Sequence, residues 1–89
     1  MGPMIGGSHT FEGSSTFDGI MKGDATIAPG ARLRLQGMIK GDVTVSEGAQ
    51  LEVHGWVKGD LTVQQGAQVR VHGFVGGDIV NHGGAVDLG

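Results

Sequence analysis

The sequence predicts an all-β fold, a single-stranded β-helix or β-solenoid in which 18-residue coils stack into three parallel sheets. The main observation is an 18-residue phrase that occurs four times, at residues 19–36, 37–54, 55–72 and, shortened, 73–89. A fixed period of this length is typical of solenoids, whose repeats cannot bury an apolar side alone and must stack on their neighbours. Two further observations agree with it, because apolar and polar residues alternate within each copy and glycines recur at constant phases.

The alternation predicts short strands with one buried face, because successive side chains of a strand point to opposite sides. When odd positions are taken as inward, every column of equivalent residues is apolar. The columns are Met21/Ile39/Val57/Val75, Ala25/Val43/Leu61/Ile79, Ile27/Val45/Val63, Ala31/Ala49/Ala67, Leu33/Leu51/Val69 and Leu35/Val53/Val71. About six residues for each short strand and its corner divide a coil into three faces, which gives a triangular prism.

Most of the 19 glycines recur at phases 19/37/55/73, 23/41/59/77 and 30/48/66. We interpret them as corners, because glycine accepts positive φ at little cost. In the fourth copy, deletion of one residue near the position of Thr62 restores the register, so that Val80, Val86 and Leu88 rejoin inward columns. Residues 1–18 then form an N-terminal segment with a partial coil over 5–18, and residues 19–89 form a four-coil solenoid.

Two outward columns carry charge. The first contains Arg34, Glu52, Arg70 and Asp87, and the second contains Asp24, Asp42, Asp60 and Asp78. The signs alternate along the first column, as pairing between neighbouring strands favours. The second column stacks like charges, which indicates either a carboxylate ladder that binds a cation or aspartates that accept a backbone N–H in the turn. The Lys22/Lys40/Lys58 column on the same face offsets the negative charge and favours the second interpretation.

Large apolar residues follow a corner glycine in each copy. They are Ile20, Met38, Trp56 and Phe74, and we call them the apolar row. By alternation they point outward, and an exposed apolar patch on a small protein typically marks an interaction surface, with Trp56 as the best anchor. The alternative is that the corner turns these side chains inward or folds them over the neighbouring glycine.

Composition excludes several classes of function. The chain has 89 residues, enough for one thin core, and no cysteine for a disulfide or a thiolate zinc site. Its net charge of −3 and scattered basic residues argue against nucleic-acid binding. It has no long apolar run, so we expect a cytoplasmic protein with no membrane span and no signal peptide.

The sequence predicts neither a catalytic nor a metal site, and no cofactor. His54 and His72 stack one coil apart without an evident third ligand, which is typical of solvated surface histidines. Nucleophile–base sets, carboxylate dyads and phosphate-binding loops do not emerge, because coil corners account for every glycine-rich stretch. We therefore expect that the chain is not an enzyme.

The two ends of the predicted solenoid carry apolar residues. They are Met4, Ile5, Phe11 and Phe17 at the N-terminal end and Val80, Val86 and Leu88 at the C-terminal end. Terminal coils expose unpaired strand edges and the open core, and natural solenoids normally cover them with caps. The sequence shows no candidate cap. It therefore predicts end-to-end self-assembly, in which the partner is another copy of the chain.

The opening of the chain resembles the start of the bactofilins, the polymer-forming cytoskeletal proteins of bacteria. The resemblance lies in Ile5-Gly-Gly-Ser-His-Thr-Phe-Glu-Gly13, in Phe17-Asp-Gly19 and in the recurring Gly-Asp-hydrophobic coils, and it covers nearly the whole chain. It implies a right-handed triangular β-helix that polymerises end to end without a nucleotide, as a cytoskeletal polymer or scaffold.

Two other interpretations stay open. Hexads at 27–32, 45–50 and 63–68 resemble the hexapeptide repeat of left-handed β-helix acyltransferases, which are trimers. A third interpretation is a small β-solenoid binding module that uses the apolar row on a partner protein. The period alone does not choose the hand of the coil.

Overall fold

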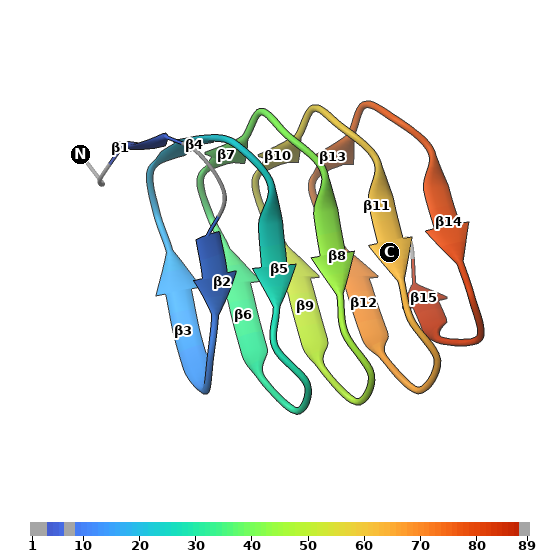
Figure 1. Ribbon diagram of the computed structural model, residues 1–89. Coiled ribbons are helices and arrows are strands. Elements are labelled where there is room, and N and C mark those ends of the chain that lie inside the picture. Colours follow the sequence, from blue (N-terminus) through green and yellow to red (C-terminus); the bar gives the residue numbers. More distant parts are fainter. Residues whose placement is uncertain (1–3, 7–8, 88–89) are drawn as a thin grey trace.

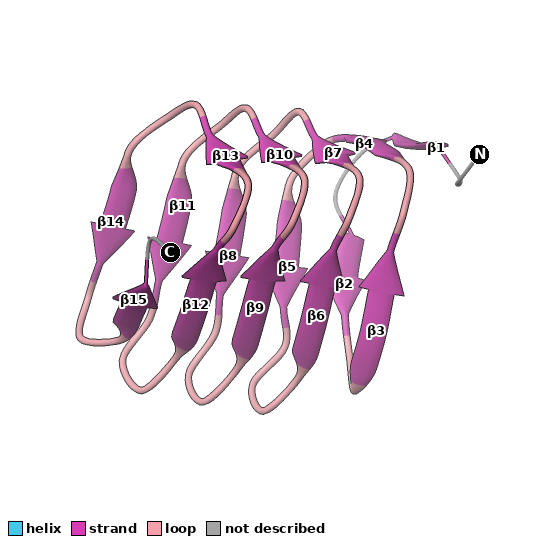
Figure 2. Cartoon of the chain, turned by 180° about the vertical axis from the view of Figure 1, so that it is seen from behind, coloured by secondary structure: helices cyan, strands magenta, loops and turns pink. Residues whose placement is uncertain are grey.

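The chain winds into a β-solenoid whose coils stack along one axis, and its computed structural model describes residues 4–6 and 9–87 (Figure 1). The described residues form no helix, and their strands make three five-stranded parallel sheets (Figure 2). Sheet A contains β1 (Met4–Gly6), β4 (Ile20–Lys22), β7 (Met38–Ile39), β10 (Trp56–Val57) and β13 (Phe74–Val75). Sheet B contains β2 (His9–Phe11), β5 (Ala25–Ile27), β8 (Val43–Val45), β11 (Leu61–Val63) and β14 (Ile79–Asn81). Sheet C contains β3 (Ser14–Phe17), β6 (Arg32–Leu35), β9 (Gln50–Val53), β12 (Gln68–Val71) and β15 (Ala85–Asp87).

The register of the central coils confirms the 18-residue period. Leu33 pairs with Leu51, and Leu51 pairs with Val69, each one coil further along sheet C. Sheets A and B repeat the same offset between their central strands. Each coil therefore places equivalent residues directly above one another, as the repeated phrase predicts.

The coil is right-handed. In Figure 1 the nearer strands of sheet B run downward, the farther strands of sheet C run upward, and the coils advance from left to right. The view from behind agrees, because sheet C is then nearer and runs upward while the coils advance from right to left (Figure 2). This is the usual hand of a connection between parallel strands of one sheet. It agrees with the bactofilin resemblance and differs from the left-handed coil of the hexapeptide-repeat alternative.

The predicted inward columns form the core. In the central coils these side chains are almost fully buried, and the described residues include no buried polar or charged side chain. The largest of them are Met21, Ile27, Leu33, Leu35, Ile39, Leu51 and Leu61. Alternation alone thus separates the core from the surface, because each sheet has one buried face.

The corner positions require glycine for two different structural reasons. Gly48 has a φ of 71°, and the equivalent Gly30 and Gly66 have φ values of 75° and 77°. These three glycines thus adopt the left-handed conformation that the sequence predicts for corners. Gly55 has no positive φ. A Cβ on Gly55 would lie far closer than 3.0 Å to the carbonyl oxygen of Gly37 in the preceding coil. This phase is glycine because neighbouring coils approach too closely for a side chain.

The last coil corrects one prediction about register. Val80 pairs with Thr62 and Asn81 with Val63, so the coil keeps the full spacing through β14. Val80 therefore points outward and is 40% exposed, instead of rejoining an inward column. Val86 does rejoin its column, opposite Val69. Leu88 lies outside the described residues.

The missing residue of the last coil lies in the corner between β14 and β15. Asn81 Oδ1 accepts hydrogen bonds from the backbone N–H groups of Gly83 (2.9 Å) and Gly84 (2.7 Å). Its Nδ2 donates to the Gly84 carbonyl oxygen (2.9 Å). The asparagine side chain thus closes a shorter corner by bonding to its own turn, as asparagine commonly does.

The N-terminal segment contributes to all three sheets. Residues 4–17 supply one strand to each of the three sheets. Phe11 pairs with Ile27 and Ser14 with Arg32, so the corner between β2 and β3 is two residues shorter than the corner that follows β5. The first and last coils are thus both shortened where sheet B leads into sheet C.

Candidate interaction surfaces

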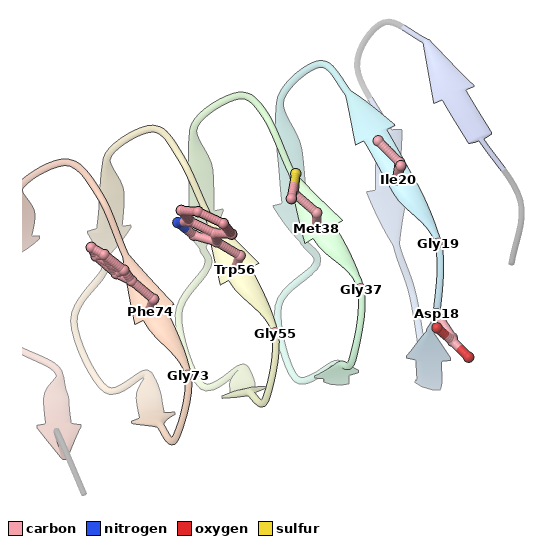
Figure 3. A pocket seen from close by; sticks show the side chains of 9 residues that line it. All are labelled: Asp18, Gly19, Ile20, Gly37, Met38, Gly55, Trp56, Gly73 and Phe74. Carbon is pink, nitrogen blue, oxygen red and sulfur yellow. The ribbon is translucent and has the colours of Figure 1, made fainter. Parts of the chain in front are cut away.

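The apolar row lies on the outer face of sheet A. Its residues begin β4, β7, β10 and β13 and pair in register from coil to coil. Figure 3 shows their side chains pointing outward on one side of the sheet. Trp56 is 42% exposed and Phe74 is 50% exposed, whereas Ile20 and Met38 are half-buried. The interpretation in which the corners turn these side chains inward is therefore wrong.

The two aromatic side chains of the row stack on each other. The rings of Trp56 and Phe74 have centroids 5.6 Å apart and planes inclined by 17°. Lys58 Nζ lies 5.2 Å from the centroid of the Trp56 ring, within reach of a cation–π interaction. The stack orders the large side chains along the solenoid axis and leaves them standing out from the sheet.

A shallow hollow of about 550 Å³ lies beside the apolar row. The side chains of the row line it on one side, and the glycine column before the row forms its floor, namely Gly19, Gly37, Gly55 and Gly73. Asp18 lies at its N-terminal end (Figure 3). We call this hollow the glycine groove. Sequence reasoning treated these glycines only as corners. The available signal was a column without side chains directly next to a column of large ones.

The C-terminal end of the solenoid leaves its core open. Val75, Ile79 and Val86 occupy inward columns but are only half-buried, whereas the equivalent residues one coil earlier are buried. Strands β13, β14 and β15 are the last strands of their sheets, and within the described residues no strand pairs with their outer edges. Of the described residues predicted for this end, Val86 lies at the open core and Val80 does not.

The two phenylalanines predicted for the N-terminal end are buried. Phe11 is 7% exposed and Phe17 is 4% exposed, so both belong to the core. Their rings pack edge to face at 5.8 Å, and the His9 ring packs on Phe11 at 4.6 Å. Met4 and Ile5 contribute backbone to β1, and their side chains lie outside the described part of the chain.

The aspartate column accepts backbone hydrogen bonds. Asp24 Oδ1 accepts from the N–H of Asp42 (3.0 Å), Asp42 Oδ1 from that of Asp60 (2.9 Å) and Asp60 Oδ1 from that of Asp78 (2.9 Å). The aspartates thus accept backbone N–H groups, as the second interpretation of this column predicts. The acceptor serves the next coil, however, and not its own turn, so the column links coils along the axis.

Replacement of Asp60 tests whether the acceptor oxygen or the charge matters in this column. Asp60→Ala removes the partner of the Asp78 N–H, and we expect the free energy of unfolding to fall by about 1 kcal/mol. Asp60→Asn keeps an acceptor oxygen and relieves repulsion between like charges, so its stability should match or exceed that of the parent. Urea unfolding followed by circular dichroism measures both. Equal losses in the two variants would show that the negative charge itself is needed.

The remaining polar contacts lie on exposed surfaces. The column of alternating charge has the predicted register, and Arg34 lies 3.7 Å from Glu52. Glu52 also lies 3.6 Å from His54, whose ring stacks on that of His72 at 5.0 Å. Among the described residues no three His, Cys, Asp or Glu side chains are grouped closely enough to hold a metal ion. The same part of the chain contains no helix with the length and apolar character to cross a membrane.

No family model, curated protein or solved structure matches the chain. Its relation to the bactofilins therefore stays a prediction from the residues quoted above. The fold and the two surfaces, the open C-terminal end and the apolar row with its groove, are the basis for any proposal about function.

Proposed function

We propose that the chain is a structural protein that assembles with copies of itself by end-to-end stacking, as a polymer or scaffold similar to the bactofilins. The open C-terminal coil carries this proposal. Val75, Ile79 and Val86 are half-buried there, although their equivalents one coil earlier, Val57, Leu61 and Val69, are buried. A further coil stacked on this end would complete their burial.

Stacking also satisfies the strand edges. In the part of the chain that the structure describes, the last strands β13, β14 and β15 have no partner on their outer edges, and such edges readily pair with another chain. Apolar area buried in the contact contributes roughly 25 cal/mol per Å² before the costs of association. A solenoid end offers both contributions at once, because adding a coil extends three sheets and the core together.

The right-handed coil supports this proposal over the acyltransferase alternative, which rests on a left-handed repeat. The described surface also offers little for chemistry. Its polar clusters include the exposed Arg34–Glu52–His54 contacts and the aspartate column, whose oxygens already accept backbone N–H groups. Two shallow hollows on sheet C are lined mainly by arginine, glutamine, serine and threonine side chains and hold no His, Cys or Asp. We therefore propose a role without catalysis.

Substitution at Val86 tests the stacking. In Val86→Lys the lysine lies at the open end of the core, where its long chain can reach water in the free protein, so the fold should survive. A stacked coil would bury the charge. We expect the concentration needed for assembly to rise about tenfold or more, measured by sedimentation and negative-stain electron microscopy.

Val80→Lys is the matched control, because Val80 lies in the same coil but points outward. It introduces the same charge away from the core and should assemble like the parent chain. Circular dichroism must show the same β-signature for both variants. If Val86→Lys assembles as the parent does, stacking through the C-terminal coil is wrong.

A further inference from the structure

A ridge and a groove run side by side along one face of the solenoid. The ridge is the apolar row, which stands out from sheet A in register over four coils. The groove is the glycine groove, whose floor is the residue directly before each member of the row. Both features run parallel to the solenoid axis (Figure 3). A surface with a ridge next to a groove of the same length is complementary to a copy of itself.

We propose that two copies pair laterally, with parallel axes of the same direction, so that the apolar row of each lies in the glycine groove of the other. The occupant of the groove is thus a second copy of this chain. The contact lies on the side of the solenoid and leaves its ends free. It is therefore independent of end-to-end stacking and would turn single filaments into paired ones.

Symmetry selects the parallel arrangement. A twofold axis parallel to the solenoid axis reverses the strand direction and keeps the order of the coils. The ridge of one copy then faces the groove of the other, and the contact occurs twice. A twofold axis along the strands reverses the order of the coils and keeps the strand direction. That arrangement sets ridge against ridge and leaves both grooves empty.

The charges beside the ridge and the groove select the same arrangement. Asp18 lies at the N-terminal end of the groove, and Lys22 is exposed just beyond the ridge in the same coil. The parallel pair sets Asp18 of each copy on the side of Lys22 of the other, which is favourable. The antiparallel pair sets the lysine column against itself, with Lys40 opposite Lys58 of the other copy.

The exposure of the row supplies the driving force. Trp56 and Phe74 are 42% and 50% exposed, although each is stacked on the other, so their outer edges face water. Aromatic residues that enter a pocket on the partner are the usual anchors of an interface. The glycine floor leaves room for them because it carries no side chains.

Site-specific cross-linking tests the pairing, and the chain offers a clean background because it contains no cysteine. Because the twofold axis runs between the row and the groove, each residue of the row lies beside the same residue of the other copy. Ile20→Cys, made in the Val86→Lys chain to suppress stacking, should therefore give a covalent dimer with a short bismaleimide. Thr26→Cys is the matched control, because it lies in the same coil on the outer face of sheet B and is also half-buried. It should give little dimer.

The antiparallel pair would place Ile20 opposite Phe74 of the other copy, three coil spacings or roughly 14 Å from the partner's Ile20, beyond the reach of a short bismaleimide. Cross-linking no stronger than that of Thr26→Cys therefore overturns the proposal. The cross-linking experiment still detects lateral pairing if the Val86→Lys chain forms long assemblies. Long assemblies of that chain would contradict end-to-end stacking through the C-terminal coil, and would leave the lateral pairing to be decided by the cross-link.

Sedimentation equilibrium gives a second measurement. The Val86→Lys chain should have twice the 9.1 kDa mass of the single chain, and addition of Trp56→Ser and Phe74→Ser should return it to the single mass. Both replaced side chains are exposed, so circular dichroism should not change. A single-mass Val86→Lys chain, or a dimer that persists after the two serine substitutions, contradicts the pairing.

Discussion

Replacement of Leu51 by aspartate is expected to unfold the whole chain. Leu51 is 1% exposed in β9, between Leu33 and Val69 of the neighbouring coils. A carboxylate there has no polar partner, because the described core contains only apolar side chains. Burial of an unpaired charge costs about 3 kcal/mol or more, against a total stability of about 5–15 kcal/mol for ordinary domains.

The position of Leu51 enlarges the effect. Coils of a solenoid contact only their neighbours, so stability is transmitted from coil to coil. A defect in a central coil separates the coils on its two sides, and each remaining part is too small to hold a core of its own. Circular dichroism should therefore show loss of the β-signature over the whole chain.

Gln50→Asp is the matched control, since Gln50 precedes Leu51 in the same strand and faces outward. Its effect on the free energy of unfolding should stay within about 0.5 kcal/mol, as for most surface substitutions. A Leu51→Asp chain that unfolds in urea with the parent's midpoint would contradict the assignment of this column to the core.

The sequence predicts the fold well because two periods act together. The 18-residue period places Leu33, Leu51 and Val69 in one column, and the two-residue period decides that this column faces inward. Neither period carries the hand of the coil. Both hands stack the same columns with the same alternation, and only the path from sheet B to sheet C distinguishes them.

The terminal coils were harder to predict, because a single deletion can be placed at several points of an alternating pattern. The alternation predicts that the apolar Val80 faces inward, whereas the pairing of β14 places it opposite Thr62. The deletion lies in the next corner, where Asn81 bonds to its own turn. At the other end, the sequence predicts Phe11 and Phe17 at an open core, whereas both are buried and their rings pack on each other.

The apolar row and the glycine groove also differ in how far the sequence predicts them. The outward direction of the apolar row was among the interpretations that the sequence allowed, since Trp56 and Phe74 occupy even positions beside inward residues. The groove was not predicted, because a glycine in a sequence does not reveal whether it serves a positive φ or the close approach of another backbone. Only the position of the neighbouring coil distinguishes these two reasons.

Gly55→Ala should therefore destabilise the chain far more than Gly48→Ala. A Cβ on Gly55 would overlap the carbonyl oxygen of Gly37, and this oxygen accepts a hydrogen bond from the N–H of Trp56 at 3.0 Å. The Gly37 oxygen belongs to the backbone and the new Cβ is fixed to it, so neither atom can rotate away. The overlap can be relieved only by separating two coils. We expect a loss of about 3 kcal/mol or more in the free energy of unfolding, at the upper end of the cost of overpacking.

Gly48→Ala meets a different obstacle. The space around Gly48 is open, with no atom closer than 4.0 Å to an added Cβ, and only its φ of 71° opposes a side chain. The left-handed conformation costs an alanine about 1–2 kcal/mol. If all corner glycines served positive φ, Gly48→Ala would be the more damaging substitution. Urea unfolding of the two variants separates the explanations, because close stacking of coils requires Gly55→Ala to have the lower midpoint.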